Sequence, residues 1–379
     1  MNRAALIAGL KRLNEPRTAP YEEREVRAAL HRWLNELALP FEVDPFGNTL
    51  VRVRYGHPRR QLAFVAHLDH PAFRVTDVKG NEITCTADGG LPTIGIKGAR
   101  VVFPHVATGT VSGRVTSAKI AVVNGRPHLE LAKIKVNPKG PTPEVGQFAV
   151  FDLPPFKQTG NRLKLRVADD LAGVVVIVAA LADLSRQTSA VDAIGVFTRA
   201  EEVGFHGSLA VAIDGRLPRD TTIVSVECSR AYGEVALGKG PVVRLGDRAG
   251  PFHPRAAGLL SGAATELAKE RFQYQSALMA GGTCEATAFA AFDYAAAGLA
   301  LPLVAYHNQG ARGVAPEEID VRDLEGAVRL IAAAARRAGA GVEDLDLLRN
   351  ALITGSEEGR KRLREPVDPA IGYPVGSKF

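Results

Sequence analysis

Two glutamates stand side by side just beyond an apolar segment of the chain. Residues 193–197 are apolar, and Glu201 and Glu202 follow within five positions. An apolar run of this length is typical of a buried strand. Both carboxylates therefore lie close to the end of a buried strand, where solvation is poor. Two neighbouring buried carboxylates are costly unless a cation or a proton-transfer reaction uses them. The pair therefore favours a fold in which strand ends converge on a polar site.

Further acidic and imidazole side chains lie at the ends of other apolar runs. His67 follows the run at 62–66, and Glu227 follows the run at 222–226. From residue 169 onward, strand-like and helix-like segments alternate, which predicts a mostly parallel sheet flanked by helices. Ligands of such α/β sheets bind at the carboxyl ends of the strands. The expected segments include helices at 22–39, 170–185, 207–214, 254–269, 284–297 and 317–337, and strands at 191–197, 221–226 and 299–305.

One part of the chain departs from this alternation. Between residues 73 and 165, short β-like runs are separated by Gly and Pro, which predicts a small β-barrel domain inserted into the α/β domain. The α/β domain is then discontinuous and comprises 1–72 and 166–340. Residues 341–379 form a C-terminal extension, with one short helix-like piece before Pro-rich irregular sequence.

Composition excludes several classes of function. The chain has 379 residues and a formal net charge of +6, but the excess of basic residues is dispersed, and the one dense basic run, at 360–364, has no interleaved aromatic residues. We therefore expect no nucleic-acid partner. The longest apolar stretch, 171–181, is too short to span a bilayer, so we expect no membrane contact. Three cysteines without CxxC spacing argue against a thiolate metal site and favour a cytoplasmic location.

The polar residues at the strand ends suit a pair of divalent cations. Asp69 lies two residues from His67 and can orient its ring, and a single carboxylate from Asp169 or Asp170 can bridge two cations. Adjacent Glu201 and Glu202 point in different directions, so one can bind a cation while the other acts as a base. Each residue also has a structural interpretation: a surface pair, a helix N-cap, an acidic turn, or, for Glu227, a salt bridge to Arg230.

Taken together with His307, which follows the run at 301–306, these residues offer two imidazoles and several carboxylates. Imidazole ligands favour zinc or cobalt over magnesium.

The ordered motifs resemble a known family, the di-zinc aminopeptidases of the tetrahedral aminopeptidase and glutamyl aminopeptidase group. They span roughly residues 20–335 and are specific as a set. They are Asp-Pro-Phe-Gly-Asn at 44–48, Ala-His-Leu-Asp at 66–69, Ala-Asp-Asp-Leu-Ala-Gly at 168–173, Glu-Glu-Val-Gly-Phe-His-Gly at 201–207, Leu-Gly-Lys-Gly-Pro at 237–241, Gly-Gly-Thr at 281–283 and Ile-Asp-Val-Arg-Asp-Leu-Glu at 319–325.

The resemblance implies a role for each ligand. His67 and Glu227 would bind one metal ion, Glu202 and His307 would bind the other, and Asp169 would bridge the two. The resemblance also implies that Asp69 orients His67, that Glu201 is the general base, and that the peptide bond between Asp169 and Asp170 is cis. The ions would be zinc, or else cobalt or manganese. Members of the family commonly form homo-oligomers, including dodecameric shells built through the inserted domain.

Three departures from the family pattern stand out, one at a metal ligand, Glu227, and two near the expected substrate side. Glu227 stands where the family usually has Asp, His70 replaces an acidic residue, and Cys284 with Glu285 follows Gly-Gly-Thr where Asp is usual. The candidates for substrate contacts are His70, His206, Gly282, Thr283 and Glu285.

The main hypothesis is a metal-dependent aminopeptidase that hydrolyses N-terminal residues from peptides with a water activated by two metal ions. Two alternatives stay open at this point. One is a non-peptidase amidohydrolase, such as a deacylase, which would use the same ligands and base. The other is a non-catalytic binding protein on the same fold.

Overall fold

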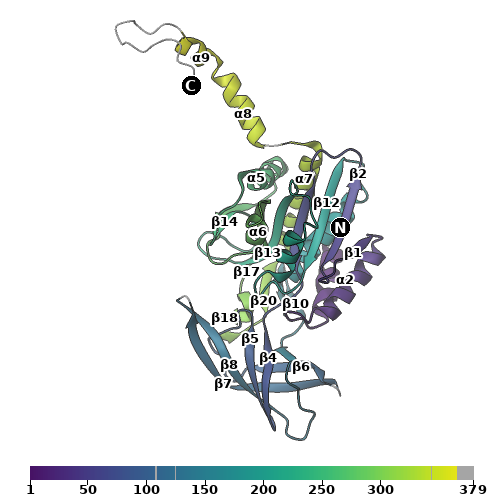
Figure 1. Ribbon diagram of the computed structural model, residues 1–379, viewed down its shortest axis with the longest axis vertical. Coiled ribbons are helices and arrows are strands. Elements are labelled where there is room, and N and C mark those ends of the chain that lie inside the picture. Colours follow the sequence, from purple (N-terminus) through teal and green to yellow (C-terminus); the bar gives the residue numbers. More distant parts are fainter. Residues whose placement is uncertain (107–108, 124, 343, 365–379) are drawn as a thin grey trace, which may run out of the picture.

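The computed structural model describes residues 1–106, 109–123, 125–342 and 344–364 and divides them into an α/β body and a β-barrel (Figure 1). The barrel lies below the body in this view, and two C-terminal helices project from the opposite end. Each part has its own cluster of buried apolar side chains. The predicted α/β fold with an inserted small barrel is confirmed.

The α/β body contains a mixed sheet whose centre is parallel. Strands β12, β3, β13 and β17 run parallel to one another, while β2 and β14 pair with this core in antiparallel fashion. The central strands are almost wholly buried because helices cover both faces of the sheet. In sheet order, the strands are β1 (Phe41–Val43), β2 (Thr49–Tyr55), β12 (Val191–Thr198), β3 (Leu62–His67), β13 (Thr222–Arg230), β17 (Ala295–Leu303), β14 (Val242–Asp247) and β15 (Gly250–Pro251), with β16 (Gln275–Leu278) paired to β14.

Helix α3 (Leu171–Leu184) begins at the site side of the sheet and is buried on nearly all sides. It packs against β3 and against α1 and α7, which explains why its apolar residues show no amphipathic pattern. Asp170 caps it, with its carboxylate accepting the backbone N–H of Gly173 at 3.2 Å. The other helices of the body are α1 (Arg3–Asn14), α2 (Arg24–Glu36), α4 (His206–Ile213), α5 (Pro254–Ala268), α6 (Glu285–Ala290) and α7 (Val321–Ala340).

Two predicted helices have the wrong extent. The helix expected at 284–297 ends at Ala290, and the alanines at 295–297 begin the central strand β17. Alanine favours a helix, but here small side chains allow a buried strand to pack closely between its neighbours. The helix expected at 317–337 begins only at Val321, because residues 317–320 form strand β20 (Glu317–Asp320) and Asp320 caps the helix by accepting the N–H of Arg322. Helix α1 was not anticipated.

The barrel is closed by six strands in the order β4-β5-β8-β7-β6-β9. A separate hairpin, β10 (Phe156–Thr159) and β11 (Arg162–Leu165), lies within the interval predicted for the insert, but β11 pairs with β20 of the body. The barrel strands are β4 (Ala72–Lys79), β5 (Glu82–Asp88), β6 (Arg100–Val106), β7 (Gly109–Val123), β8 (Arg126–Val136) and β9 (Phe148–Phe151).

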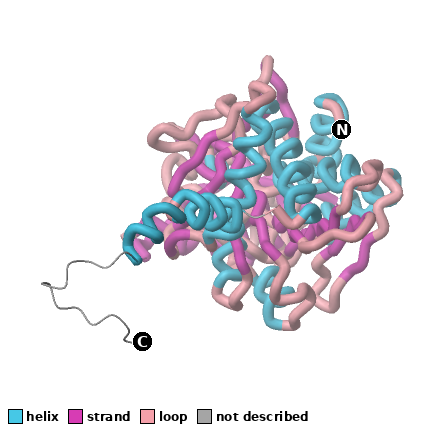
Figure 2. The backbone as a smooth tube through the Cα atoms, turned by 90° about the horizontal axis from the view of Figure 1, so that it is seen from above, coloured by secondary structure: helices cyan, strands magenta, loops and turns pink. Residues whose placement is uncertain are grey.

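The described part of the C-terminal extension is helical. It contains α8 (Asp344–Gly355) and α9 (Glu357–Arg364), where the sequence predicted one short helix. The Pro-rich sequence predicted after that helix falls on residues 365–379, which lie outside the described residues. Viewed from above, this arm leaves the body at one side (Figure 2). Within the described residues, no helix combines the length and apolar character that a membrane crossing requires.

Candidate metal site

The carboxyl ends of the central strands bring the predicted ligands together. His67 is the last residue of β3, and Thr198, the last residue of β12, is its partner in the sheet register. Glu201 and Glu202 lie in the turn that follows β12, and Glu227 lies within β13 rather than after it. His307 lies in the short helix η1 (Tyr306–Asn308), just beyond β17.

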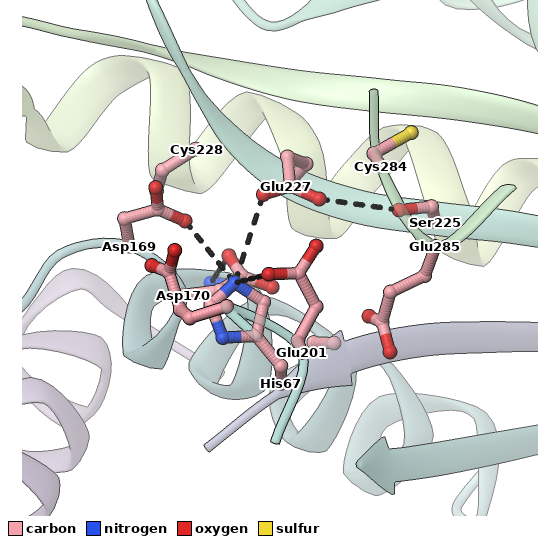
Figure 3. Close-up of polar contacts among 12 residues, drawn as sticks. His67, Asp169, Asp170, Glu201, Ser225, Glu227, Cys228, Cys284 and Glu285 are labelled. Carbon is pink, nitrogen blue, oxygen red and sulfur yellow. Dashed lines mark hydrogen bonds and ion pairs between the residues drawn. The ribbon is translucent and has the colours of Figure 1, made fainter. Parts of the chain in front are cut away.

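His67 is surrounded by carboxylates. Its Nε2 atom lies 3.4 Å from Asp169 Oδ1, 3.7 Å from Glu227 Oε1 and 3.8 Å from Glu201 Oε2, as Figure 3 shows. Ligand atoms of His67, Glu201 and Glu227 all lie within 4.8 Å of one another. No contact between Glu227 and Arg230 accompanies this arrangement among the described residues, so the salt-bridge interpretation of Glu227 has no support.

His307 forms a second group around the other oxygen of the same aspartate. Its Nε2 atom lies 3.1 Å from Glu202 Oε1 and 3.7 Å from Asp169 Oδ2. Asp169, Glu202 and His307 also present ligand atoms within 4.8 Å of one another. Asp169 thus presents one oxygen to each imidazole, and the two adjacent glutamates face different imidazoles.

The donor atoms fit divalent cations. His67 Nε2, Asp169 Oδ1, Glu202 Oε1 and His307 Nε2 are buried atoms without a hydrogen-bond partner among the described residues. Buried polar groups are normally paired, and two imidazoles with several carboxylates form the ligand set that zinc and related ions prefer. The residues present therefore fit a pair of such ions.

The site concentrates negative charge in a buried region. Burial raises the pKa of Asp169 and of Glu201 well above the usual range, and the neighbouring carboxylates add to the effect. Burial also opposes ionisation of Glu202, but the adjacent His307 outweighs it and lowers that pKa. For His307, burial disfavours the charged ring, yet Glu202 raises its pKa to about 9. Nearby positive charge therefore stabilises the site.

Asp69 supports the site through the backbone. Its Oδ1 accepts the N–H of Glu201 at 2.9 Å, and its Oδ2 accepts the N–H of Glu202 at 3.1 Å. The Nδ1 atom of His67 lies 3.2 Å from the backbone oxygen of Asp69 and 3.6 Å from its carboxylate. The carboxylate of Asp69 therefore holds the turn that carries both glutamates, and its backbone oxygen is the nearer partner of the His67 ring.

Glu317 is a functional candidate that sequence reasoning missed. Its carboxylate is fully buried; Oε2 accepts the N–H groups of Ala168 (2.7 Å) and Asp169 (2.9 Å), and Oε1 accepts that of His307 (2.8 Å). The only signal in the sequence was an acidic residue ten positions after His307, and that residue was assigned to a helix. The peptide bond between Asp169 and Asp170 is cis, as the family resemblance implied.

The predicted substrate contacts differ in accessibility. His70 is buried, with Nδ1 2.9 Å from the backbone oxygen of Asp169 and Nε2 3.1 Å from Asn308 Oδ1. Glu285 is also buried, and its Oε1 accepts hydrogen bonds from the hydroxyls of Ser208 and Thr198. Both side chains are engaged by protein groups, which favours a supporting role over direct substrate contact.

The remaining three candidates lie nearer the surface. His206 is exposed, and its Nδ1 lies 2.7 Å from the hydroxyl of Tyr21. Thr283 is half-buried, and a side chain at Gly282 would meet open space. A role of these residues in substrate binding stays a prediction.

Comparison with known proteins agrees with this geometry. The model of the M42 glutamyl aminopeptidase family matches residues 47–330. A protein of Acetivibrio thermocellus named "Putative aminopeptidase" is 27% identical over 274 residues, which cover 69% of this chain and 78% of that protein.

Two solved structures share the fold. Aminopeptidase APDkam598 from the archaeon Desulfurococcus kamchatkensis has a TM-score of 0.74 at 23% identity, covering 88% of this chain and 95% of the other. The TET1 peptidase of Pyrococcus horikoshii has a TM-score of 0.72 at 23% identity, covering 87% and 99%.

Proposed function

The chain belongs to the M42 glutamyl aminopeptidase family and is a peptide hydrolase; from that premise, we propose that it removes N-terminal residues from peptides with the help of two divalent cations. Zinc is the first choice for both ions, with cobalt or manganese as alternatives. His67 and Glu227 would hold one ion, Glu202 and His307 would hold the other, and Asp169 would bridge them.

The observation that carries this proposal is the orientation of Asp169. One of its oxygens faces His67 and the other faces His307, at 3.4 and 3.7 Å. Each of the three side chains also has a buried atom without a hydrogen-bond partner among the described residues: His67 Nε2, Asp169 Oδ1 and His307 Nε2. A single carboxylate between two imidazoles is what a paired-cation site requires.

When bound, such a cation pair polarises a carbonyl group and lowers the pKa of a water molecule to about 7. Glu201 would accept a proton from the attacking water as its oxygen adds to the scissile carbonyl carbon. As the C–N bond breaks, Glu201 would return this proton to the leaving amine nitrogen. The free α-amino group of a peptide would bind next to the cation pair, which restricts cleavage to the N-terminus.

We further propose that the chain assembles with copies of itself. The Pyrococcus horikoshii peptidase is described as assembling into a tetrahedron or a large octahedral shell, and the shared fold includes the inserted barrel. Residues 73–165 would serve assembly and substrate access. Size-exclusion chromatography with light scattering, on the full-length protein at micromolar concentration, would test this: a shell gives one large species, and a monomer would contradict the proposal.

The test of the activity compares matched substrates. Full-length protein is stripped with a chelator, reloaded with zinc, cobalt or manganese, and assayed on aminoacyl amides and on the same compounds with an acetylated α-amine. We expect metal-dependent hydrolysis of the free-amine compounds only. Hydrolysis of the acetylated compounds alone would identify a deacylase. No hydrolysis of either set by protein that holds two cations would identify a binding protein.

A further inference from the structure

The imidazole of His307 makes its second contact with the inserted domain. Its Nδ1 atom lies 2.9 Å from the backbone oxygen of Gly90. Gly90 belongs to the segment 89–99, which connects β5 to β6 of the barrel. A carbonyl oxygen can only accept a hydrogen bond, so Nδ1 carries the proton, which leaves Nε2 as the atom free to bind a cation.

The contact is too close for any residue but glycine at position 90. A Cβ atom there would lie 2.7 Å from Nδ1 and 3.1 Å from Cε1 of His307. The backbone of Gly90 has no positive φ, so the requirement comes from the approach of the ring and not from the conformation of the chain. A methyl group at this position would have to displace the imidazole or the segment itself.

Gln309, which directly follows the short helix η1 that carries His307, forms hydrogen bonds to the same segment. Its Oε1 accepts the backbone N–H groups of Thr93 (2.9 Å) and Ile94 (3.2 Å), and its Nε2 donates to the backbone oxygens of Gly310 (3.0 Å) and Ile94 (3.4 Å). All hydrogen-bonding positions of this amide are used. The side chain of Gln309 therefore sets the distance between the barrel segment and His307.

The same segment also contacts Glu202, the carboxylate nearest to the His307 ring. A Cβ atom at Gly89, which has a φ of +85°, would lie 3.1 Å from the Cβ atom of Glu202. The segment thus packs against two members of the group formed by Asp169, Glu202 and His307. The His67 ring, in contrast, has its second nitrogen next to the backbone oxygen of Asp69, two residues along the chain.

We propose that Gly90 and Gln309 are positioning residues for His307, so that the inserted barrel completes the cation site of His307 but not that of His67. This rests on the proposal that both groups bind divalent cations. The orienting partners of metal-binding imidazoles change metal affinity about 10- to 100-fold when they are lost. The barrel thereby supports one of the two sites directly.

The experiment measures each cation site separately in the full-length protein. Cobalt is titrated into chelator-stripped wild type, Gly90→Ala and Gln309→Ala, with binding followed by calorimetry and by the visible spectrum. The spectra of His307→Ala and of His67→Ala identify which site is lost. Gly140→Ala is the matched control, because a Cβ there meets its nearest neighbour only at 3.6 Å and Gly140 also lies in a loop of the insert.

We expect wild type and Gly140→Ala to bind two ions, and Gly90→Ala to bind the second ion about 10- to 100-fold more weakly, with a spectrum like that of His307→Ala. Gln309→Ala should show the same loss, and Gln309→Glu should show it too, since its second carboxylate oxygen cannot donate to the backbone oxygens of Gly310 and Ile94. The Gln309 variants also keep the test valid if Gly90→Ala does not fold.

The inference would be overturned if both sites of the Gln309 variants bound cobalt with wild-type affinity, or if both sites were weakened by the same factor. Fewer than two ions in the wild type would instead contradict the proposed two-cation function. The two failures are therefore distinguishable.

Discussion

The rings of His67 and His307 face the two oxygens of Asp169, and the chain holds these two rings in different ways. His67 ends a central strand, and its second ring nitrogen meets the backbone oxygen of Asp69. His307 lies in the short helix η1, and its second ring nitrogen meets the backbone oxygen of Gly90, 217 positions away. One half of the site is therefore built by local strand geometry, and the other depends on how the inserted barrel meets the body.

This difference has a physical consequence. A strand inside a sheet is held by hydrogen bonds on both sides and by buried neighbours, so His67 has little freedom to move. His307 is held instead by groups from distant segments, the carboxylate of Glu317 in β20 and the backbone oxygen of Gly90 in the insert. Changes around His307 should therefore affect one cation selectively, whereas changes to groups that both rings share should affect both.

The largest effect is expected for Glu201→Gln. Glu201 lies in the His67 group, but we assign it to proton transfer and not to cation binding. We expect kcat to fall by about 10²- to 10⁴-fold, with both cations retained. Steady-state kinetics together with metal analysis of the purified variant provides the test. Loss of one cation in this variant would make Glu201 a ligand of the His67 site.

Glu317→Gln should weaken both halves of the site at once. Glu317 accepts hydrogen bonds from the backbone N–H groups of Asp169 and His307. In glutamine, an NH₂ group replaces one of the two oxygens, so it would face a backbone N–H that it cannot accept. We expect both cations to bind about 10- to 100-fold more weakly and the free energy of unfolding to fall by about 3 kcal/mol. Calorimetric titration and urea unfolding measure the two effects.

The control for this prediction is Glu318→Gln. Glu318 is the next residue of β20, and among the described residues its carboxylate forms ion pairs only at 3.8 Å to Arg162 and 3.5 Å to Lys164. Replacing Glu318 should leave the affinity for both cations and the free energy of unfolding nearly unchanged. Selective weakening of a single cation in Glu317→Gln would show that Glu317 does not couple the two halves.

Glu285→Gln should change the pH dependence of stability on the His67 side. Figure 3 shows Glu285 to the right of Glu201, and burial raises the pKa of Glu285 from 4.5 to about 7. Because the folded pKa is the higher one, the wild type loses stability as the pH rises from about 4.5 to about 7. Metal-free Glu285→Gln should match the wild type below this window and exceed it above, by up to about 3 kcal/mol.

Urea unfolding of chelator-treated protein at a series of pH values measures this difference. A difference between variant and wild type that stays constant from pH 4 to pH 8 would exclude titration of Glu285 in that range.

The smallest effect is expected for Asp69→Asn. An asparagine keeps one acceptor for the turn of Glu201 and Glu202 but places an amide nitrogen against the other N–H. The backbone oxygen of Asp69 remains next to the ring of His67, so this ring keeps its nearer partner. We expect about a tenfold fall in kcat/KM and little change in cobalt affinity at the His67 site. A selective loss of that site would show that the carboxylate orients His67.

Sequence patterns predicted the body of the fold because most of its elements follow simple rules. The apolar runs before His67 and Glu201 are buried strands, and Asp170 caps a buried helix. The pattern failed at Ala295–Ala297, where helix-favouring residues form a central strand, because packing between neighbours outweighs a weak local preference. It also failed at Glu317, because a short strand of four residues carries too little periodicity to be recognised.

The sequence by itself determined which side chains are available as ligands and that they lie toward the carboxyl ends of apolar strands, because the apolar runs before His67 and Glu201 mark buried strands. Only the tertiary structure decided how these groups face one another. That Asp169 divides its two oxygens between the imidazoles, that Glu317 holds Asp169 and His307, and that Gly90 meets His307 all depend on contacts between distant segments. No local pattern encodes such contacts, since they arise when the sheet, the helix and the inserted barrel pack together.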